Sequence, residues 1–505
     1  MKYTGINIGP VVSTISMGRK PREIWAASYM FSFLMECIIN NIPDSVIIVS
    51  PAKLPKNEKN GIGLYPDRVF VKGEFDVNKV IEDALADFKE VTGVDASYVN
   101  VMHVTIDGDD SSKDKDTIKR LNLLLDRTEL YNRPVDNGMR NKVLKLIRKK
   151  GESPLFYQAF GSKTFDIPYL AEIATQKLEA LNETAWKNLC NEYRGKDSDK
   201  DGDEDSFCQE LKRNFKNIYG EDYFSYYKYI CIVQADGDNM GKIVSSISAD
   251  DVLKVSDALL KYGVKACEKI REYGGLPIYA GGDDLLFISP VNGKNNNIFG
   301  LIDEIDELYA EKVDKSIEGF RPDNLHTYLS YGLSISYYKY PLNEAFKDAR
   351  NLLDKAKNVT INKEKLKNAV SWCLRKHSGS GFNGEISKSN DIYNGLKAII
   401  NASVEEKQIS AIAHKLKNNE NMLDILLEKY RLDKNENELK ARLENFYKKT
   451  MEDTGNNKYT TLTRELLFKL MYTANEETKI ETILENMYGM LRTAKFIKGE
   501  GDKDE

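Results

Sequence analysis

The sequence lacks the patterns that mark several classes of protein. Its 505 residues include six cysteines and four histidines, with no CxxC pair, no HD pair and no HExxH motif. These absences argue against a zinc ribbon, a disulfide framework and a histidine-based metal hydrolase. The strongest membrane candidate, residues 24–35, falls short of the ~20 apolar residues of a spanning helix, and residues 1–10 lack the apolar core of a secretory signal. We therefore expect reduced thiols, no membrane contact and a cytoplasmic protein.

Neither charge nor composition points to a particular partner. The net charge is −5 at pH 7, so the total does not indicate a nucleic-acid-binding protein. Such a contact would have to come from local patches such as the basic stretch 140–150, which is more often the solvated face of an amphipathic helix. With 41% hydrophobic residues, a chain of this length should form about three or four domains with packed cores.

The pattern of apolar residues divides the chain into four parts. Residues 1–115 alternate short β-like runs with helical ones, which predicts an α/β domain. Residues 116–225 show helical spacing, interrupted by an acidic loop at 195–206, and predict a helical middle domain. Residues 226–375 follow the β-α-β-β-α-β order of a ferredoxin-like fold, and residues 376–505 predict a helical C-terminal bundle.

Two acidic clusters stand out within residues 226–375. The stretch "QADGDNMGK" places Asp236 and Asp238 after an apolar run, and "LPIYAGGDDLLFISP" places Asp283 and Asp284 in the turn of a predicted hairpin. In a β-α-β-β fold the first strand can lie beside the hairpin, so these carboxylates could converge. Carboxylates suit Mg²⁺, and two such ions can activate an attacking hydroxyl and stabilise a leaving pyrophosphate.

Three glycines accompany these carboxylates. Gly281 and Gly282 permit positive φ angles and close approach of a nucleotide to the backbone, while Gly237 removes a side chain where the first strand opens toward the phosphates. A plain hairpin is the alternative, because Gly and Asp favour turns in any case. The two clusters together, each next to an apolar strand, favour the metal site over the plain hairpin.

The same two clusters resemble those of a known family. "ADGDNMGK" followed by "YAGGDDLL" is similar to the large palm-domain subunit of type III CRISPR effector complexes, most like the Cmr (III-B) type. "GRKPREIWAAS" at 18–28, "YPDRVFV" at 65–71 and the later "IPYLAEIAT" resemble further segments of that family. The resemblance implies an α+β multidomain protein with two ferredoxin-like palm domains, plus helical domains. The first palm (1–115) would be non-catalytic and the second (226–375) catalytic.

The resemblance also implies roles for individual residues. Asp236, Asp283 and Asp284 would be catalytic and would hold Mg²⁺ or Mn²⁺. The predicted contacts to the nucleotide come from Gly237, Asp238, Asn239, Gly281, Gly282 and Lys357, the last in the segment "ARNLLDKAKN".

The function implied is a nucleotidyltransferase activated by target RNA in an antiviral complex. It would use ATP and two metal ions to make a second messenger, either a cyclic oligoadenylate or AMP joined to S-adenosylmethionine. Partners would be the other subunits of the type III effector complex, and crRNA and target RNA through that complex. Two departures from the family are visible: the chain has neither an HD nuclease domain nor the usual four-cysteine zinc site between the palms.

Two other functions stay open at this point. One is a non-catalytic scaffold subunit that binds crRNA and partner subunits, although a scaffold has no need of four clustered carboxylates with their desolvation cost. The other is a stand-alone enzyme like the diguanylate cyclases, for which glutamate and phenylalanine are expected in the stretch where this chain has Asp284-Leu285-Leu286.

Overall fold

The computed structural model describes most of the 505 residues. The residues outside the described part are 55–60, 109–114, 131–136, 150–151, 162–166, 194–203, 221–222, 323–324, 359, 362–363, 366, 378, 390, 403–405, 452–457 and 500–505. The predicted acidic loop at 195–206 lies largely among them.

A four-stranded antiparallel sheet forms the first part of the chain, with strand order β2-β3-β1-β4. Its strands are β1 (Lys2–Gly9), β2 (Ile47–Ser50), β3 (Arg68–Lys72) and β4 (Asn100–Asp107). The helices α1 (Val11–Ile15), α2 (Pro21–Asn41) and α3 (Val77–Thr92) connect them. Helix α2 is buried along nearly its whole length, which explains why its sequence is apolar on all sides.

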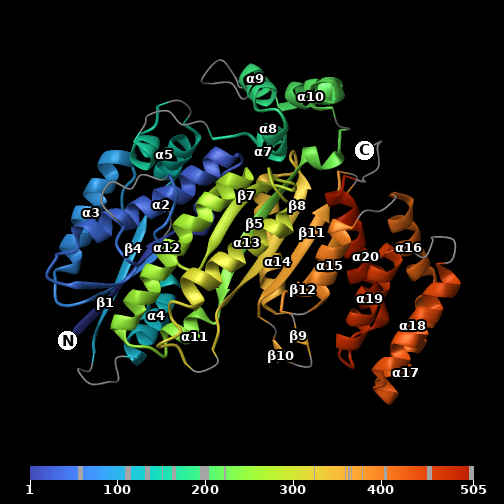
Figure 1. The fold of residues 1–505 in the computed structure, drawn as a ribbon. Helices are drawn as coiled ribbons and strands as arrows, with labels where there is room; N and C mark the ends of the chain where they lie inside the picture. The colour runs from blue at the N-terminus through green and yellow to red at the C-terminus, as the bar shows by residue number, and fades with distance from the viewer. Residues whose placement is uncertain are drawn as a thin grey trace.

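The middle of the chain is helical, as its apolar spacing predicts. It comprises α4 (Lys115–Glu129), α5 (Asn137–Arg148), α6 (Pro154–Phe160), α7 (Leu170–Ala174), α8 (Lys177–Leu181), α9 (Glu183–Tyr193) and α10 (Glu204–Tyr219). Helix α4 packs on β1 and β4, and α5 packs on α2. Helices α7 to α10 lie along one end of the second sheet, at the top of Figure 1.

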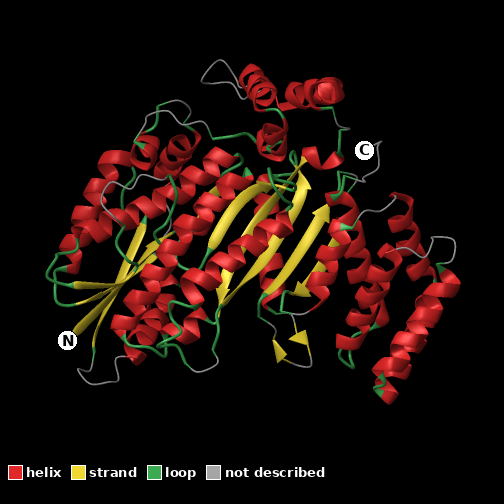
Figure 2. Cartoon of the chain, in the orientation of Figure 1, coloured by secondary structure: helices red, strands yellow, loops and turns green. Residues whose placement is uncertain are grey.

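A six-stranded sheet forms the centre of the molecule, with strand order β12-β11-β8-β5-β7-β6 (Figure 2). Its strands are β5 (Tyr229–Asp238), β6 (Leu276–Tyr279), β7 (Leu285–Pro290), β8 (Tyr328–Tyr337), β11 (Ala369–Arg375) and β12 (Gly381–Ser387). Up to β8 the chain follows the predicted order β-α-β-β-α-β, through α12 (Ala249–Tyr273) and α13 (Ile298–Tyr309). The order β8-β5-β7-β6 matches the order β4-β1-β3-β2 of the first sheet, so both sheets have the ferredoxin-like topology. Strand β12 adds to the sheet beyond residue 375, where the domain boundary was predicted.

Helix α14 (Leu342–Lys357) follows β8 and packs on β8, β11 and β5. A glycine on β8 permits this close packing, because a Cβ on Gly332 would lie 2.1 Å from the carbonyl oxygen of Ala349. Helix α14 runs antiparallel to its strand and returns toward the end of the sheet where β8 begins. Short α11 (Met240–Val244) and the small strands β9 (Thr360–Ile361) and β10 (Glu364–Lys365) lie at that end (Figure 1).

The C-terminal part is helical. It contains α15 (Asp391–Asn401), α16 (Glu406–Asn418), α17 (Glu420–Asp433), α18 (Glu436–Thr450), α19 (Lys458–Thr473) and α20 (Ile480–Ile497). Helix α20 packs against the edge strand β12, where the Asn486 side chain bonds both the N–H (3.0 Å) and the carbonyl (2.8 Å) of Glu385. All six cysteines are free. No helix in the described part of the chain is long and apolar enough to cross a membrane.

The two sheet domains meet at the hairpin β6–β7. The Ala280 N–H donates to the Gly63 carbonyl at 2.9 Å, and the Ser28 hydroxyl donates to the Ile278 carbonyl at 3.2 Å. Residue Gly63 also forms a parallel β-bridge with Tyr279. The first domain therefore contacts β6, the strand that leads into the GGDD turn (residues 281–284).

Candidate active site

The end of β5 and the turn 281–284 meet closely, as the sequence predicts. A Cβ on Gly237 would lie 2.6 Å from Oδ2 of Asp283 and 2.9 Å from the hydroxyl oxygen of Tyr309. These distances are too short for any side chain. Glycine at 237 therefore lets the carboxylate of the turn lie directly over the strand.

The two glycines of the turn have different surroundings. Gly282 has a φ of +67°, a left-handed conformation that favours glycine, and a Cβ there would meet nothing within 4 Å. Gly281 is buried, and a Cβ there would lie 2.3 Å from the hydroxyl oxygen of Tyr279. Backbone geometry thus requires the second glycine and packing requires the first.

Lys357, the last residue of α14, contacts Oδ2 of Asp236. Both side chains are partly exposed, so this pair lies at the surface of the site. Burial, and then repulsion from Lys367, lower the pKa of Lys357 to about 8, whereas the contact with Asp236 acts in the opposite direction. The structure thus brings together two of the predicted residues from elements that are far apart in the sequence.

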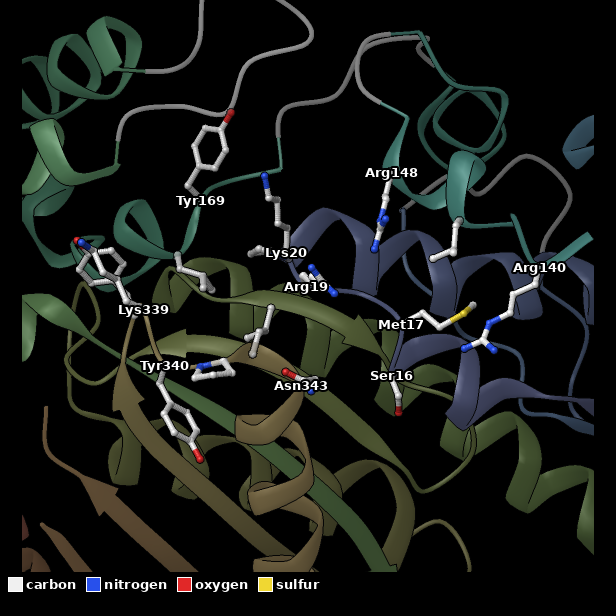
Figure 3. A pocket seen from close by; sticks show the side chains of 16 residues that line it. Ser16, Met17, Arg19, Lys20, Arg140, Arg148, Tyr169, Lys339, Tyr340 and Asn343 are labelled. Carbon is white, nitrogen blue, oxygen red and sulfur yellow. The ribbon is translucent and has the colours of Figure 1, made fainter. Parts of the chain in front are cut away.

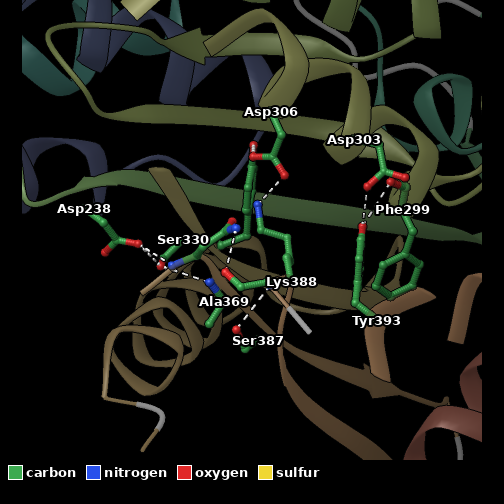
Figure 4. A network of polar contacts seen from close by, with 12 residues as sticks. Asp238, Phe299, Asp303, Asp306, Ser330, Ala369, Ser387, Lys388 and Tyr393 are labelled. Atoms are coloured by element: carbon green, nitrogen blue, oxygen red, sulfur yellow. Dashed lines mark hydrogen bonds and ion pairs between the residues drawn. The ribbon is translucent and has the colours of Figure 1, made fainter. Parts of the chain in front are cut away.

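Asp238 is buried and links the end of β5 to β8 and to the residues just before β11. Its Oδ2 accepts hydrogen bonds from the Ser330 hydroxyl at 2.6 Å and the Asn368 N–H at 2.7 Å, and Lys367 lies 3.6 Å from Oδ1 (Figure 4). The side chain has no exposed surface. A nucleotide cannot reach it without rearrangement, so the geometry favours a structural role over the predicted nucleotide contact.

Asn239 shapes the exit from β5. Its φ of +65° is left-handed, and its side-chain amide donates to the His326 carbonyl at 2.9 Å. Asparagine tolerates this conformation better than most residues. It starts α11 and turns the chain away from the end of the strand, while its predicted nucleotide contact stays untested.

Loss of solvation raises the pKa of both Asp283 and Asp284. For Asp283 the charge of Asp238 adds to this effect, and a backbone hydrogen bond opposes it. For Asp284, at the exposed rim of the turn, Asp283 and then Asp67 add repulsion, while Arg350 opposes it. A nearby cation would stabilise the ionised form of carboxylates that are crowded in this way. Carboxylates with a shifted pKa are frequent in functional sites.

The fit of these carboxylates to a metal ion is partial. Among the described residues, no group of three or more His, Cys, Asp or Glu side chains is arranged to hold a metal ion. Because successive strand residues point to opposite faces, Asp236 and the Asp283 carboxylate over Gly237 approach β5 from different sides. Magnesium needs only one or two carboxylates when substrate phosphates complete its shell. The donor chemistry therefore fits, and the metal and catalytic roles of Asp236, Asp283 and Asp284 stay predictions.

Sequence reasoning missed several neighbours of this site. Asp67 lies near Asp284 although it belongs to the first domain, and its motif "YPDRVFV" was noticed only as a resemblance. Arg350 lies in the same quoted segment as Lys357. Ser330 gave no signal, because a serine on an apolar strand shows no partner until the strands are paired.

Comparisons with known proteins agree with this geometry. Residues 229–370 match the family described as Cas10/Cmr2, second palm domain, and residues 3–59 match the N-terminal family of CRISPR-associated protein Cmr2. These two matches support a subunit of the Cas10/Cmr2 type.

Individual Cas10/Cmr2-type relatives support the same assignment. The Cmr subunit Cmr2 of Pyrococcus furiosus is 29% identical over 182 residues, which cover 31% of this chain and only 19% of that protein. In fold, the chain is similar to a subunit of the type III-B Cmr-beta complex in its apo state, with a TM-score of 0.57 and 13% identity. A subunit of a Cmr-beta complex bound to cognate target RNA is similar with a TM-score of 0.56 and 12% identity. These alignments cover 99% of this chain and 82% or 83% of those chains. The α+β architecture with palm domains is thus confirmed.

Proposed function

We propose that this chain is a nucleotidyltransferase of a type III CRISPR antiviral system. It would transfer AMP from ATP with release of pyrophosphate and so make a second messenger. The observation that carries this proposal is that three groups lie at one end of the second palm: the carboxylate of Asp283 over Gly237 and, on the other side of β5, Asp236 with the amine of Lys357.

Each group has a chemical task in this proposal. Asp236, Asp283 and Asp284 would hold Mg²⁺ or Mn²⁺, which when bound lowers the pKa of an attacking hydroxyl and offsets charge on the leaving pyrophosphate. Lys357 would exchange its contact with Asp236 for the triphosphate, since a phosphate offers more negative charge than one carboxylate. The open space beside Gly282 leaves room for a nucleotide against the backbone.

The proposed partners follow from the relatives. One similar structure is a Cmr-beta complex with cognate target RNA. We infer that this chain likewise assembles with the other subunits of a type III effector complex, meets crRNA and target RNA there, and is activated by target RNA. The acceptor of AMP would be a second ATP, giving cyclic oligoadenylate, or S-adenosylmethionine.

The test uses the assembled complex with target RNA, ATP and Mg²⁺ or Mn²⁺, with and without S-adenosylmethionine, and identifies products by mass spectrometry. We expect an adenylate product that falls at least 100-fold in Asp283→Asn, because one oxyanion-stabilising or metal-holding group is commonly worth about that factor. The control is Asp83→Asn, an exposed aspartate of α3, which should retain full activity.

The same assay separates the alternatives. No product under any condition would indicate the scaffold function, which the lack of a three-ligand cluster among the described residues favours. A product from GTP alone, without target RNA, would indicate a stand-alone enzyme like the diguanylate cyclases. Full activity of Asp283→Asn would overturn the proposed site.

A further inference from the structure

A basic cavity of about 960 Å³ opens at the other end of the second sheet (Figure 3). Its walls come from the turn between α1 and α2, from α5, from residues 169–170 and from the turn between β8 and α14. Five cationic side chains line it: Arg19, Lys20, Arg140, Arg148 and Lys339. No Asp or Glu is among the described residues that line it, although the chain as a whole carries a net charge of −5.

An acidic partner of two of these cations, Glu23, is not itself among the residues that line the cavity. Glu23 is buried, accepts a hydrogen bond from the Arg19 N–H at 2.9 Å and lies 3.7 Å from Nε of Arg148. The residues that line the cavity therefore bring five cationic side chains and no carboxylate to its walls.

Two helix N-termini add to this positive field. Helix α2 begins at Pro21 and α14 begins at Leu342, both in the cavity wall, and neither has a side-chain hydrogen bond at its N-cap. The N-terminus of a helix carries a partial positive charge that favours anions. The helices have 21 and 16 residues, and one acidic residue in the first turn of each, Glu23 and Glu344, offsets part of this charge.

Aromatic and polar side chains complete the walls. Tyr169 and Tyr340 are half-buried beside the cations, and Ser16 and Asn343 offer hydrogen-bonding groups. Figure 3 shows Lys339, Tyr340 and Asn343 on one side and Arg19, Lys20 and Arg148 on another. Aromatic faces among cations are typical of sites that stack bases and bind the backbone of single strands.

We propose that this cavity binds a segment of single-stranded nucleic acid through its phosphodiester backbone. The volume and the spread of the cations over separate elements suit several consecutive phosphates better than one small anion. Base stacking on Tyr169 or Tyr340 would add affinity without strong sequence preference. The proposal concerns binding, so it does not depend on the nucleotidyl transfer proposed above.

The cavity is remote from the candidate active site. Strand β8 runs from Tyr328, which pairs with Asp238, to Tyr337, which pairs with Tyr229, and the cavity begins at the next residue, Tyr338. Ten residues of strand span roughly 33 Å. A ligand in the cavity therefore does not overlap with a nucleotide at the GGDD turn.

The test measures binding of a fluorescently labelled single-stranded RNA to the full chain by polarisation, over a series of salt concentrations. The variant is the triple substitution Arg140→Gln, Arg148→Gln and Lys339→Gln, all at exposed positions. Its matched control, Lys417→Gln, Lys448→Gln and Lys449→Gln, changes the net charge equally at exposed positions of α16 and α18. Thermal unfolding verifies that both variants fold, and the single variant Lys339→Gln serves if the triple variant does not.

We expect the triple variant to bind at least tenfold more weakly and the control to bind as the wild type does. For single strands the slope of log K against log salt is about −0.7 per phosphate contact, so the triple variant should lose about two units of slope. Labelled single-stranded DNA tests whether the 2′-hydroxyl contributes, and equal binding still supports the site. Equal affinity of wild type and triple variant overturns it. Full displacement of the RNA by ATP at matched phosphate concentration also overturns it, because the cavity is then a mononucleotide site.

Discussion

The absence of a side chain at Gly237 allows the GGDD turn to lie close to the end of β5. At Gly237 the space that a Cβ needs is filled by Asp283 and Tyr309. At Gly241, four residues further along the chain, a Cβ would meet nothing within 4 Å and φ is not left-handed. The two glycines therefore form a natural pair for comparison.

Gly237→Ala should lower the free energy of unfolding by about 1–3 kcal/mol, the usual cost of overpacking a filled space. Gly241→Ala should leave it unchanged or raise it slightly, because alanine is the better helix residue. Urea unfolding followed by circular dichroism measures both. Equal urea midpoints of the two variants would contradict the claim that Asp283 and Tyr309 fill the space beside Gly237.

At this scale the sequence predicted part of the site. The order of the strands and the positions of the acidic clusters predicted that the end of β5 lies at the turn that contains Asp283. Lys357 was also a predicted site residue, and the packing of α14 places it beside Asp236. The burial of Asp238 could not be predicted. It depends on hydrogen bonds from Ser330 and Asn368, which are distant in sequence and carry no recognisable motif.

Between elements, an ion pair with a buried lysine joins α13 to the residue that follows β12. Lys388 is only 3% exposed, contacts Oδ2 of Asp306 and lies 4.2 Å from the ring centroid of Tyr331 (Figure 4). The Tyr331 hydroxyl donates to Asp306 at 2.9 Å. Because Lys388 is withdrawn from water while Asp306 is only partly buried, the lysine depends on this carboxylate for its charge partner.

Lys388→Met should destabilise the chain by about 1–3 kcal/mol, since it leaves the partly buried Asp306 carboxylate without its cation. The double variant Asp306→Asn with Lys388→Met should recover most of this loss. The exposed pair of Lys261 and Asp257 on α12 is the control, and Lys261→Met should cost less than about 1 kcal/mol. Urea unfolding measures all three, and equal costs of Lys388→Met and Lys261→Met would contradict the argument.

Prediction from sequence was most successful for the elements up to β8. Turn residues and alternating apolar patterns located each strand and each long helix of the two palm-like domains in order, whereas the short helices α1 and α11 were not predicted. Strands β11 and β12 were not predicted. They join the sheet because α14 returns the chain beside β8, so their pairing is a tertiary effect.

In the whole molecule, α14 joins the two proposed sites. Its first turn lines the basic cavity and its last residue, Lys357, contacts Asp236. Sixteen residues of helix span about 24 Å, and Gly332 lets the middle of α14 pack tightly on β8. A helix held in this way moves as one body, so a ligand that fixes its N-terminus also restricts its C-terminus.

Single-stranded RNA in the cavity should therefore slow amide hydrogen exchange along α14 as far as its last turn, and not only at residues 338–343. Hydrogen exchange with mass spectrometry, with and without RNA, measures this peptide by peptide. The triple variant of Arg140, Arg148 and Lys339 should lose the protection at both ends of α14, while the triple variant of Lys417, Lys448 and Lys449 should keep it. Protection confined to residues 338–343 would show that RNA binds without reaching Lys357. Protection at both ends would make α14 the physical connection through which bound RNA restrains the lysine at the candidate active site.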